Sequence, residues 1–362
     1  MHIYKMPNGK WRVVVQDERR RRSKVTATQR EAKLAGAQLA IELGKQPDPV
    51  GQTVGDLIDL HLNLTPRAKT TVKDHEYLVA KIPGWMLEWR VQNVTTMMVS
   101  QAYHQLQHAD GWTPHRVRRL HEILRPAFDR AAIWGWVPNN PVIPVKPPPK
   151  PEVDMDVPAP AAVTRLVDAA FRFKPDFGCA ILITSRTGIR RGELCALQWD
   201  DIDEASRTIN IRRSLSTTTG DAHHERRGKI GKAGHRIIPV PPEVIMAIRA
   251  HRTRMAAQAL DHGHPLTKWV FTVDGQRPWR TDYVTLALAR LQQDQDDPIH
   301  IHQLRHFAAT QWIGAGIDPK TVSHLLGHTN VSTTLNIYTA YLPTKGQEAA
   351  DVMARIFANG GT

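Results

Sequence analysis

The sequence predicts a multidomain, mainly helical protein that carries two small antiparallel β-sheets. Three observations predict this class. The chain has 362 residues, more than one ordinary domain needs. Strand-like alternation is confined to the N-terminus and to a patch between 207 and 240, and most of the rest has the i, i+3, i+4 spacing of amphipathic helices. A proline-rich segment, 141–160, is predicted to be an extended linker between a smaller and a larger part.

Composition limits the class of partner. The formal net charge is +13 and the isoelectric point about 9.9. Such a surplus favours a polyanion, nucleic acid before an anionic membrane, although a merely soluble basic protein has it too. The sequence has no apolar run long enough to span a membrane, and "MHIYKMPNGKW" has no signal-peptide core. Because Cys179 and Cys195 form no zinc or disulfide spacing, we expect a cytoplasmic protein.

Residues 1–48 have the pattern of a small separate module. Asn8-Gly9 between two alternating runs predicts a β-hairpin, and "SKVTATQREAKLAGAQLAIELG" predicts a strand end and then a helix that stops near Gly44. A basic run just after the second strand would give the sheet a basic tip, which suits a reader of a DNA groove. A solvated charge run in a turn is the alternative. The run consists of Arg19, Arg20, Arg21 and Arg22.

Residues 52–140 are predicted to be all helical. One helix begins after Thr53, and another after Thr113, where Pro114 takes the first helical position. Pro126 is expected to kink or split that second helix. The helix is basic, which suits either a DNA phosphate backbone or an ordinary amphipathic helix. Its candidate DNA contacts are Arg116, Arg118 and Arg119.

Residues 161–345 alternate helix signals with one β patch. "AAVTRLVDAAFR" and "FGCAILITSRTG" have helical spacing, as does most of the sequence from about 281. Between them, "RTINIRRSLS", "RRGKIGK" and "HRIIPV" predict the strands of a small antiparallel sheet. The tail, 346–362, again has apolar residues at helical spacing.

Two arginine motifs in this larger part indicate an anion site. Arg190 stands at a predicted helix start just after Gly188, where backbone amides would face the same anion. Glu193 either caps that helix or pairs with an arginine. In "HQLRHF", His302 and Arg305 are three residues apart and share a helix face beside an apolar stripe. Cationic groups held near a core need an anion.

A third motif lies near the end of this part. His328 follows Gly327, the predicted stop of a short helix, and is thereby exposed. Tyr338 lies ten residues further on, in a short helix that also carries Tyr341. Taken singly, such a histidine and such tyrosines are ordinary surface and core residues, so only the combination of motifs carries information.

That combination resembles one family, the tyrosine recombinases or phage integrases. The resemblance rests on "TGIRRGEL", "HQLRH", "LLGH" and "TTLNIY", in that order and spacing. A lysine on the β-hairpin belongs to the family's catalytic set, and the form "KIGKAGHR" favours Lys229, with Lys232 as the alternative. The other catalytic positions that the resemblance implies are Arg190, His302, Arg305, His328 and Tyr338.

The reaction that the family implies agrees with the chemistry of these side chains. Arginine forks bind the non-bridging oxygens of a phosphodiester and stabilise the charge that its transition state gathers. Tyr338 would attack phosphorus and form a 3′-phosphotyrosine, His302 would act as base or phosphate donor, and His328 would donate to the phosphate. The hairpin lysine would protonate the leaving 5′-oxygen. The ester conserves the bond energy, and no acidic cluster resembles a two-metal site, so no cofactor and no metal are expected.

The resemblance also implies an architecture. Residues 52–140 correspond to the family's helical core-binding domain and 161–345 to its catalytic domain. The module 1–48 resembles the arm-type DNA-binding domain of lambda-type integrases, which implies integration and excision of a phage or other mobile element in a bacterial host. The tail, 346–362, would dock on a neighbouring protomer or on its own domain. The implied partners are double-stranded attachment sites, a homotetramer on DNA, a host bending factor and an excision directionality factor.

Three other classes share parts of the pattern. A type IB topoisomerase uses the same tyrosine chemistry, but the basic N-terminal module and "LLGH" favour a recombinase. A DNA-binding repressor without catalysis would be expected to have lost Tyr338 or Arg305. A metal-dependent transposase or nuclease needs a carboxylate cluster that the sequence does not offer.

Overall fold

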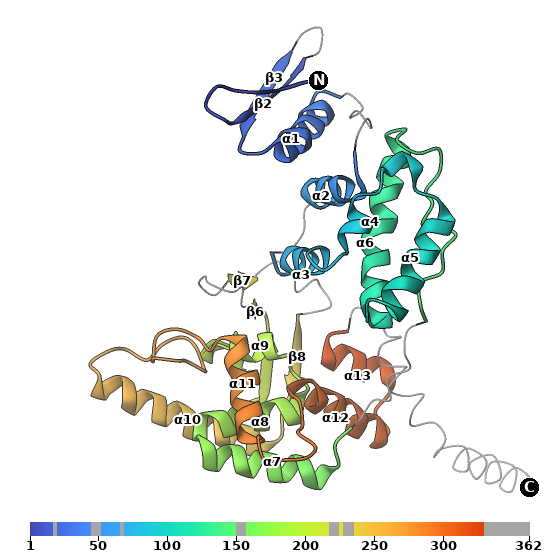
Figure 1. Ribbon diagram of the computed structural model, residues 1–362. Helices are drawn as coiled ribbons and strands as arrows, with labels where there is room; N and C mark the ends of the chain where they lie inside the picture. The colour runs from blue at the N-terminus through green and yellow to red at the C-terminus, as the bar shows by residue number, and fades with distance from the viewer. Residues whose placement is uncertain are drawn as a thin grey trace, which may run out of the picture. The chain divides into compact units, whose positions relative to one another are not determined.

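The protein divides into two compact units, residues 1–153 and 154–362, so that the boundary falls in the proline-rich segment. Figure 1 shows the elements of each unit in a computed structural model. The structure describes residues 1–16, 20–44, 52–65, 69–149, 157–216, 224–226 and 235–328. Within these ranges no helix is long and apolar enough to cross a membrane.

The first unit begins with a three-stranded antiparallel sheet of order β1-β2-β3. The strands are β1 (His2–Lys5), β2 (Trp11–Gln16) and β3 (Arg21–Thr26). The predicted hairpin at Asn8-Gly9 is confirmed, and Gly9 adopts the positive φ (78°) that such a turn requires. The basic run does more than follow the hairpin, because Arg21 and Arg22 form the start of β3 and pair with β2.

The helix α1 (Gln29–Glu42) covers one face of this sheet. Thr28 caps it by accepting a hydrogen bond from the backbone of Glu31, whose side chain caps in return. Val13 and Val15 of β2 pack against small residues of α1, so the odd-numbered side chains of β2 form the inner face. The even-numbered side chains of β2 therefore point to the other face.

The rest of the described first unit is helical. Thr53, Thr95 and Thr113 each cap a helix by accepting from a backbone amide of its first turn. The last helix passes unbroken through Pro126, so the predicted split does not occur, because the buried stripe of this helix continues on both sides of the proline. The helices are α2 (Val54–Leu64), α3 (Lys69–Val79), α4 (Gly84–Leu87), α5 (Thr96–His108) and α6 (Pro114–Ile133), with a 3₁₀ turn at Val91–Asn93.

The second unit is a helical body with two small antiparallel β elements. Its helices are α7 (Pro160–Phe173), α8 (Pro175–Thr187), α9 (Arg191–Cys195), α10 (Pro242–Asp261), α11 (Thr281–Leu291), α12 (Ile301–Gly314) and α13 (Pro319–Leu326), with a 3₁₀ turn at Trp199–Asp201. Its strands are β4 (Ile202–Asp203), β5 (Thr208–Ile211), β6 (Ser214–Ser216), β7 (His224–Arg226) and β8 (Arg236–Pro239).

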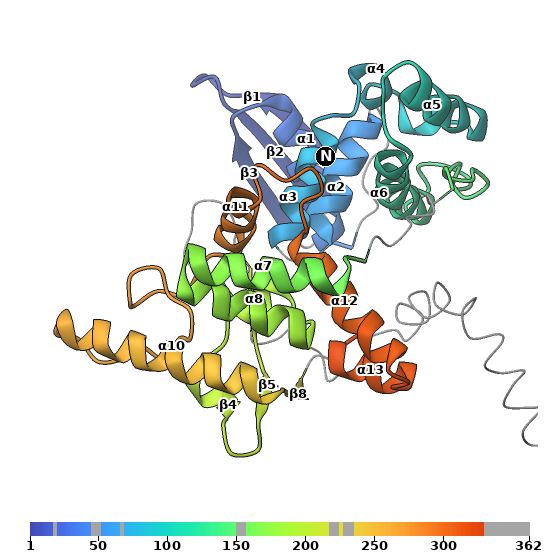
Figure 2. The same ribbon diagram turned by 90° about the horizontal axis from the view of Figure 1, so that it is seen from below.

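The helix α8 is the centre of the second unit. Nearly all of its residues are buried, and it packs against α7, α10 and α12. Figure 2 shows α7 and α8 side by side, with α10 beyond α8. Where one sheet was expected, β4, β5 and β8 form a three-stranded sheet and β6 pairs with β7 in a separate ribbon. The core of the unit therefore holds both ends of α8 in place, including Gly188, which ends the helix in the left-handed region.

Candidate active site

Three helix ends in the second unit bring the predicted site residues together. Arg190 is the N-cap of α9, His302 and Arg305 lie on α12, and His328 follows Gly327, the C-cap of α13. The end of α13 is the meeting point, because each of its last carbonyl oxygens accepts a hydrogen bond from a different arginine. The pairs are Arg236 with Leu325, Arg305 with Leu326 and Arg190 with Gly327.

Arg305 is the buried member of this group, with only 3% of its surface exposed. Its Nη1 donates to the carbonyl of Gly188 at 2.7 Å, and its Nη2 donates to the carbonyl of Leu326 at 2.6 Å. Both acceptors lie at helix C-termini, where unpaired carbonyls attract a cation. Burial, together with the charge of Arg190, lowers the pKa of Arg305 to about 9. The guanidinium therefore stays charged near neutral pH.

Arg190 is the accessible member, with 39% of its side chain exposed. Its Nη2 donates to the carbonyl of Gly327 at 2.7 Å, and its Nη1 donates to Oε1 of Glu193 at 2.9 Å. The backbone N–H of Arg190 donates to the other carboxylate oxygen, Oε2, at 2.9 Å. The alternatives predicted for Glu193, helix cap or ion-pair partner, are thus both realised. Arg190 is held in place and still open to a ligand.

Arg236 belongs to the site, although the sequence predicted no role for it: it ends the form "KIGKAGHR", which served only to choose the hairpin lysine. Its side chain is completely buried and donates through Nη1 and Nη2 to the two oxygens of Glu193, at 3.1 and 2.8 Å. Burial would raise the pKa of Glu193, but the hydrogen bonds and charges of Arg236 and Arg190 outweigh it and hold that pKa below its ordinary value.

The histidines of the site are neutral at pH 7. Burial is the main cause that lowers the pKa of His302, His306 and His328, and nearby arginines lower it further. The pKa of His328 falls to about 4. His302 and His306 are one helical turn apart, with ring centroids 4.9 Å apart in an edge-to-face contact, and the buried Nδ1 of His306 has no hydrogen-bond partner in the described part of the chain.

The structure describes only some of the remaining predicted residues. Lys229, Lys232, Tyr338 and Arg19 lie outside the described residues, as does Tyr341. The other predicted basic residues of the first unit are described and make several contacts. On α6, Arg116 lies over the ring of Trp112, Arg118 donates to the carbonyl of Pro148 at 2.6 Å and Arg119 pairs with Glu122. Arg20, Arg21 and Arg22 are exposed at the start of β3.

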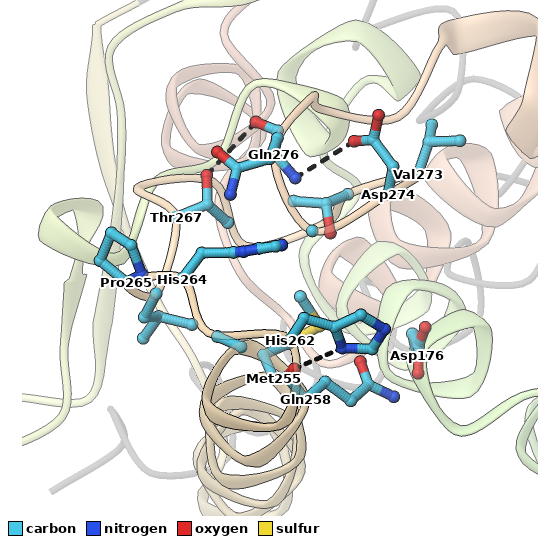
Figure 3. Close-up of a pocket in the computed structure, with 14 residues that line it drawn as sticks. Asp176, Met255, Gln258, His262, His264, Pro265, Thr267, Val273, Asp274 and Gln276 are labelled. Atoms are coloured by element: carbon cyan, nitrogen blue, oxygen red, sulfur yellow. Dashed lines mark hydrogen bonds between the residues drawn. The ribbon is translucent and has the colours of Figure 1, made fainter.

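The second unit also contains a cavity of about 560 Å³ that none of the predicted site residues lines. Figure 3 shows it between the start of α8, the end of α10 and the loop that follows α10. Nδ1 of His262 donates to the carbonyl oxygen of Gln258 at 2.7 Å, and Asp274 accepts from the backbone N–H of Gln276 in its own turn. The side chains of His262 and Asp274 therefore stabilise local structure at the cavity wall.

Arginines and neutral histidines gathered around one helix end are suited to a tetrahedral anion. A buried and an accessible guanidinium can together bind the oxygens of one phosphate, and imidazoles can donate to it or accept a proton. Such a site is suited to an enzyme that acts on phosphodiesters. The chain belongs to the phage integrase family, whose model matches residues 160–344. It is a site-specific recombinase of the tyrosine type.

Relatives of similar length support this assignment. A XerC-like tyrosine recombinase of Caldanaerobacter subterraneus subsp. tengcongensis is 26% identical over 357 residues, which covers 92% of this chain and 90% of that protein. The ICEBs1 integrase of Bacillus subtilis is 25% identical over 372 residues, which covers 97% of this chain and 98% of that protein. The match therefore extends through both units.

Solved structures share the fold. The Tn1549 transposon integrase in complex with a circular intermediate DNA superposes with a TM-score of 0.66 at 20% identity, covering 79% of this chain and 94% of that chain. A lambda integrase dimer bound to a COC′ core site superposes with a TM-score of 0.60 at 16% identity, covering 92% and 93%. The helix-rich fold with small antiparallel sheets is thus that of the lambda-type and transposon integrases.

Proposed function

We propose that the protein integrates and excises a phage or other mobile element by cutting and rejoining DNA through a 3′-phosphotyrosine intermediate. The observation that carries this proposal is that buried Arg305 and accessible Arg190 both donate to carbonyl oxygens at the end of α13. The chain continues from this end to His328 and, ten residues further on, to Tyr338. Relatives named as integrases of ICEBs1 and Tn1549 support a role in a mobile element.

The arginines supply the electrostatic part of the mechanism. Arg190 and Arg305 clamp the two non-bridging oxygens of the scissile phosphate, where negative charge accumulates in the pentacovalent transition state. Their hydrogen bonds to Gly327, Gly188 and Leu326 fix the forks before DNA arrives. Little reorganisation is then needed during the reaction.

The covalent step exchanges the bond from phosphorus to the 5′-oxygen for a bond to tyrosine, and the phosphate stays on the 3′-oxygen of its deoxyribose. The phenol oxygen of Tyr338 forms a bond to phosphorus while the bond from phosphorus to the 5′-oxygen breaks. The phenol proton leaves toward His302, and Lys229, or alternatively Lys232, gives a proton to the departing 5′-oxygen. His328 donates to a phosphate oxygen. Because an ordinary phenol has a pKa near 10, the positive field of the arginines is needed to favour the phenolate.

The N-terminal sheet is the second DNA-binding element in this proposal, with residues 1–48 as an arm-type module. Since α1 covers the inner face, the outer face presents Tyr4, Arg12 and Val25, which lie side by side in the strand register. Tyr4 and Val25 are 45% and 41% exposed. A sheet face with cations and an accessible aromatic ring fits the major groove of DNA.

The assembly in this proposal is a homotetramer on two attachment-site duplexes. A lambda integrase tetramer bound to a Holliday junction supports it by its shared fold, at a TM-score of 0.59 and 17% identity. In the cell, a host DNA-bending factor and an excision directionality factor would select between integration and excision. The core-binding and catalytic domains, 52–140 and 161–345, would hold the DNA, with 346–362 docked on a neighbouring protomer.

Trapping on a nicked suicide duplex that carries a candidate core site tests the proposal. Loss of the nicked fragment prevents religation, so a covalent adduct accumulates and is seen on a denaturing gel. We expect an adduct with wild type and with Tyr341→Phe, the matched control, and none with Tyr338→Phe. An adduct lost only in Tyr341→Phe would move the nucleophile by one turn. No adduct from a wild-type protein that binds the duplex would refute the covalent mechanism.

A further inference from the structure

The side chain of Arg236 is completely buried in the second unit. It takes an inward position of β8, between exposed neighbours along the strand, and none of its side chain reaches solvent. Its Nη1 and Nη2 face the carboxylate of Glu193, which takes the place that a DNA phosphate would need. The residue therefore acts, if it acts at all, through the groups that it contacts.

Those contacts join two separate parts of the site. The Nη1 and Nη2 atoms of Arg236 donate to Oε1 and Oε2 of Glu193, and its Nε donates to the carbonyl of Leu325 at 2.6 Å. Gly327 lies so close that a Cβ built on it would be 2.8 Å from Nη1 of Arg236. One planar guanidinium thus binds the start of α9 and the end of α13 together.

Glu193 passes this restraint to Arg190. Each carboxylate oxygen accepts one hydrogen bond from Arg236 and one from Arg190: Oε1 from the two Nη1 atoms, and Oε2 from Nη2 of Arg236 and the backbone N–H of Arg190. With both oxygens shared in this way, the carboxylate has one orientation. The accessible arginine is therefore aimed by a buried one that lies 46 positions further along the chain.

Stability alone does not require this arrangement. A buried ion pair gains little net free energy, because the cost of removing both charges from water offsets their attraction, and apolar residues of similar volume often serve as well. What an apolar residue cannot do is fix a carboxylate and a helix end at the same time. The ion pair is suited to geometric control.

We propose that Arg236 is a positioning residue for DNA cleavage, which aims Arg190 through Glu193 and ties the strand β8 to the segment that carries His328. This inference rests on the proposed function. It predicts that loss of the guanidinium fork slows the chemical step and leaves DNA binding almost unchanged, because the groups that contact DNA are all still present.

The experiment compares Arg236→Lys and Arg236→Met with wild type on the nicked suicide duplex. Lysine keeps the charge but cannot bridge both oxygens of Glu193 and the Leu325 carbonyl. Binding is measured by fluorescence anisotropy, the cleavage rate at saturating protein by single turnover, and folding by thermal unfolding. Ile248→Val, in the buried face of α10, is the control for lost stability without a change at the site.

We expect both Arg236 variants to bind within about threefold of wild type and to cleave about 10- to 100-fold more slowly, with Arg236→Lys the faster of the two. Adding Arg236→Met to Glu193→Gln should slow cleavage little further, because the two residues act on Arg190 through the same hydrogen bonds. Ile248→Val should cleave at the wild-type rate.

Two results would overturn the positioning role. One is a folded Arg236→Lys protein that cleaves like wild type. The other is a loss of binding and cleavage in parallel with thermal stability, in both Arg236 variants, which would leave Arg236 a purely structural residue. Absence of any adduct from wild type is a different result, since it counts against the covalent mechanism and not against this residue.

Discussion

The carbonyl oxygen of Gly188 lies 2.7 Å from Nη1 of Arg305, so the end of α8 holds the buried arginine of α12. Gly188 has a φ of 59°, in the left-handed region, and a Cβ built on it would lie 2.6 Å from Cδ2 of Leu326. A side chain at this position would thus meet both a backbone penalty and a collision with α13. The position of Arg305 depends on a glycine in another helix.

Gly188→Ala should therefore lower both stability and cleavage. We expect the free energy of unfolding to fall by about 1–2 kcal/mol because of the left-handed backbone, and by about 1–3 kcal/mol more because of the collision with Leu326. Gly263→Ala is the matched control, because Gly263 also has a positive φ (71°) but open space around its Cβ position. Urea unfolding measures the stability of both variants, and single-turnover cleavage of the nicked duplex measures their activity. Equal losses in the two variants would show that Leu326 yields without cost.

Gly192 sets the approach of α9 to the strand β6. A Cβ built there would lie 2.5 Å from the carbonyl oxygen of Leu215 and 2.5 Å from Oγ of Ser214. Alanine would stabilise the helix α9 by about 1 kcal/mol, but its Cβ would push β6 away from α9. Because β6 leads into the segment with Lys229 and Lys232, we expect cleavage to fall about tenfold while DNA binding is retained.

Gly84→Ala in α4 is the control for this prediction, since nothing lies within 4 Å of its Cβ position. It should cleave at the wild-type rate in the single-turnover assay. If Gly192→Ala cleaved as fast as Gly84→Ala, the spacing between α9 and β6 would have no part in placing the hairpin lysine.

The site could be predicted from the sequence only where its residues stand in recognisable motifs. Arg190 is more than a hundred residues from His302, Arg305 and His328, and a known family pattern connects them. Arg236 ends the family-like form "KIGKAGHR", but nothing in that form indicates its partner Glu193, which lies 43 positions earlier. The contact between them is tertiary, so spacing could not predict it.

The fold shows the same division between local and tertiary effects. Caps such as Thr53 and Thr113 and the turn at Gly9 were predictable, because each satisfies backbone groups within a few residues. Of the kink or split predicted at Pro126, the split was wrong, because packing on both sides of the proline keeps the helix continuous. The roles of Lys229 and Tyr338 stay predictions.

Acid should weaken the second unit partly through His328. Burial, with the charges of Arg305 and Arg190, lowers its pKa from an ordinary value near 6.5 to about 4. The unfolded chain therefore binds more protons than the folded one between these values, so the stability that neutral His328 contributes is present above pH 6.5 and is lost as pH falls toward 4.

Urea unfolding at pH 7 and pH 5 measures this effect, and His328→Gln should reduce the difference in stability between the two pH values. His324→Gln, an exposed residue of the same short helix α13, controls for the substitution itself. A His328→Gln protein with the full wild-type pH dependence would assign the acid sensitivity to other groups, His302 and His306 first.

The two faces of the N-terminal sheet should differ in their contribution to DNA binding. Arg21 pairs with Gln16 and so belongs to the outer face, whereas Lys24 pairs with Val13, whose side chain points to α1. Arg21→Glu and Lys24→Glu change the net charge of the module equally and lie on the same strand. They differ only in the face that carries the new charge.

If the outer face lies in a groove of DNA, Arg21→Glu should weaken binding to attachment-region DNA without a core site by about tenfold or more. It should also lower the slope of affinity against salt concentration, because a phosphate or base contact is lost. Lys24→Glu should lower the affinity for this DNA only about two- to threefold, because it acts through long-range charge alone. Gel-shift titrations of the full chain at several salt concentrations measure both quantities. Equal losses would mean that the module attracts DNA by its net charge and that neither face reads it.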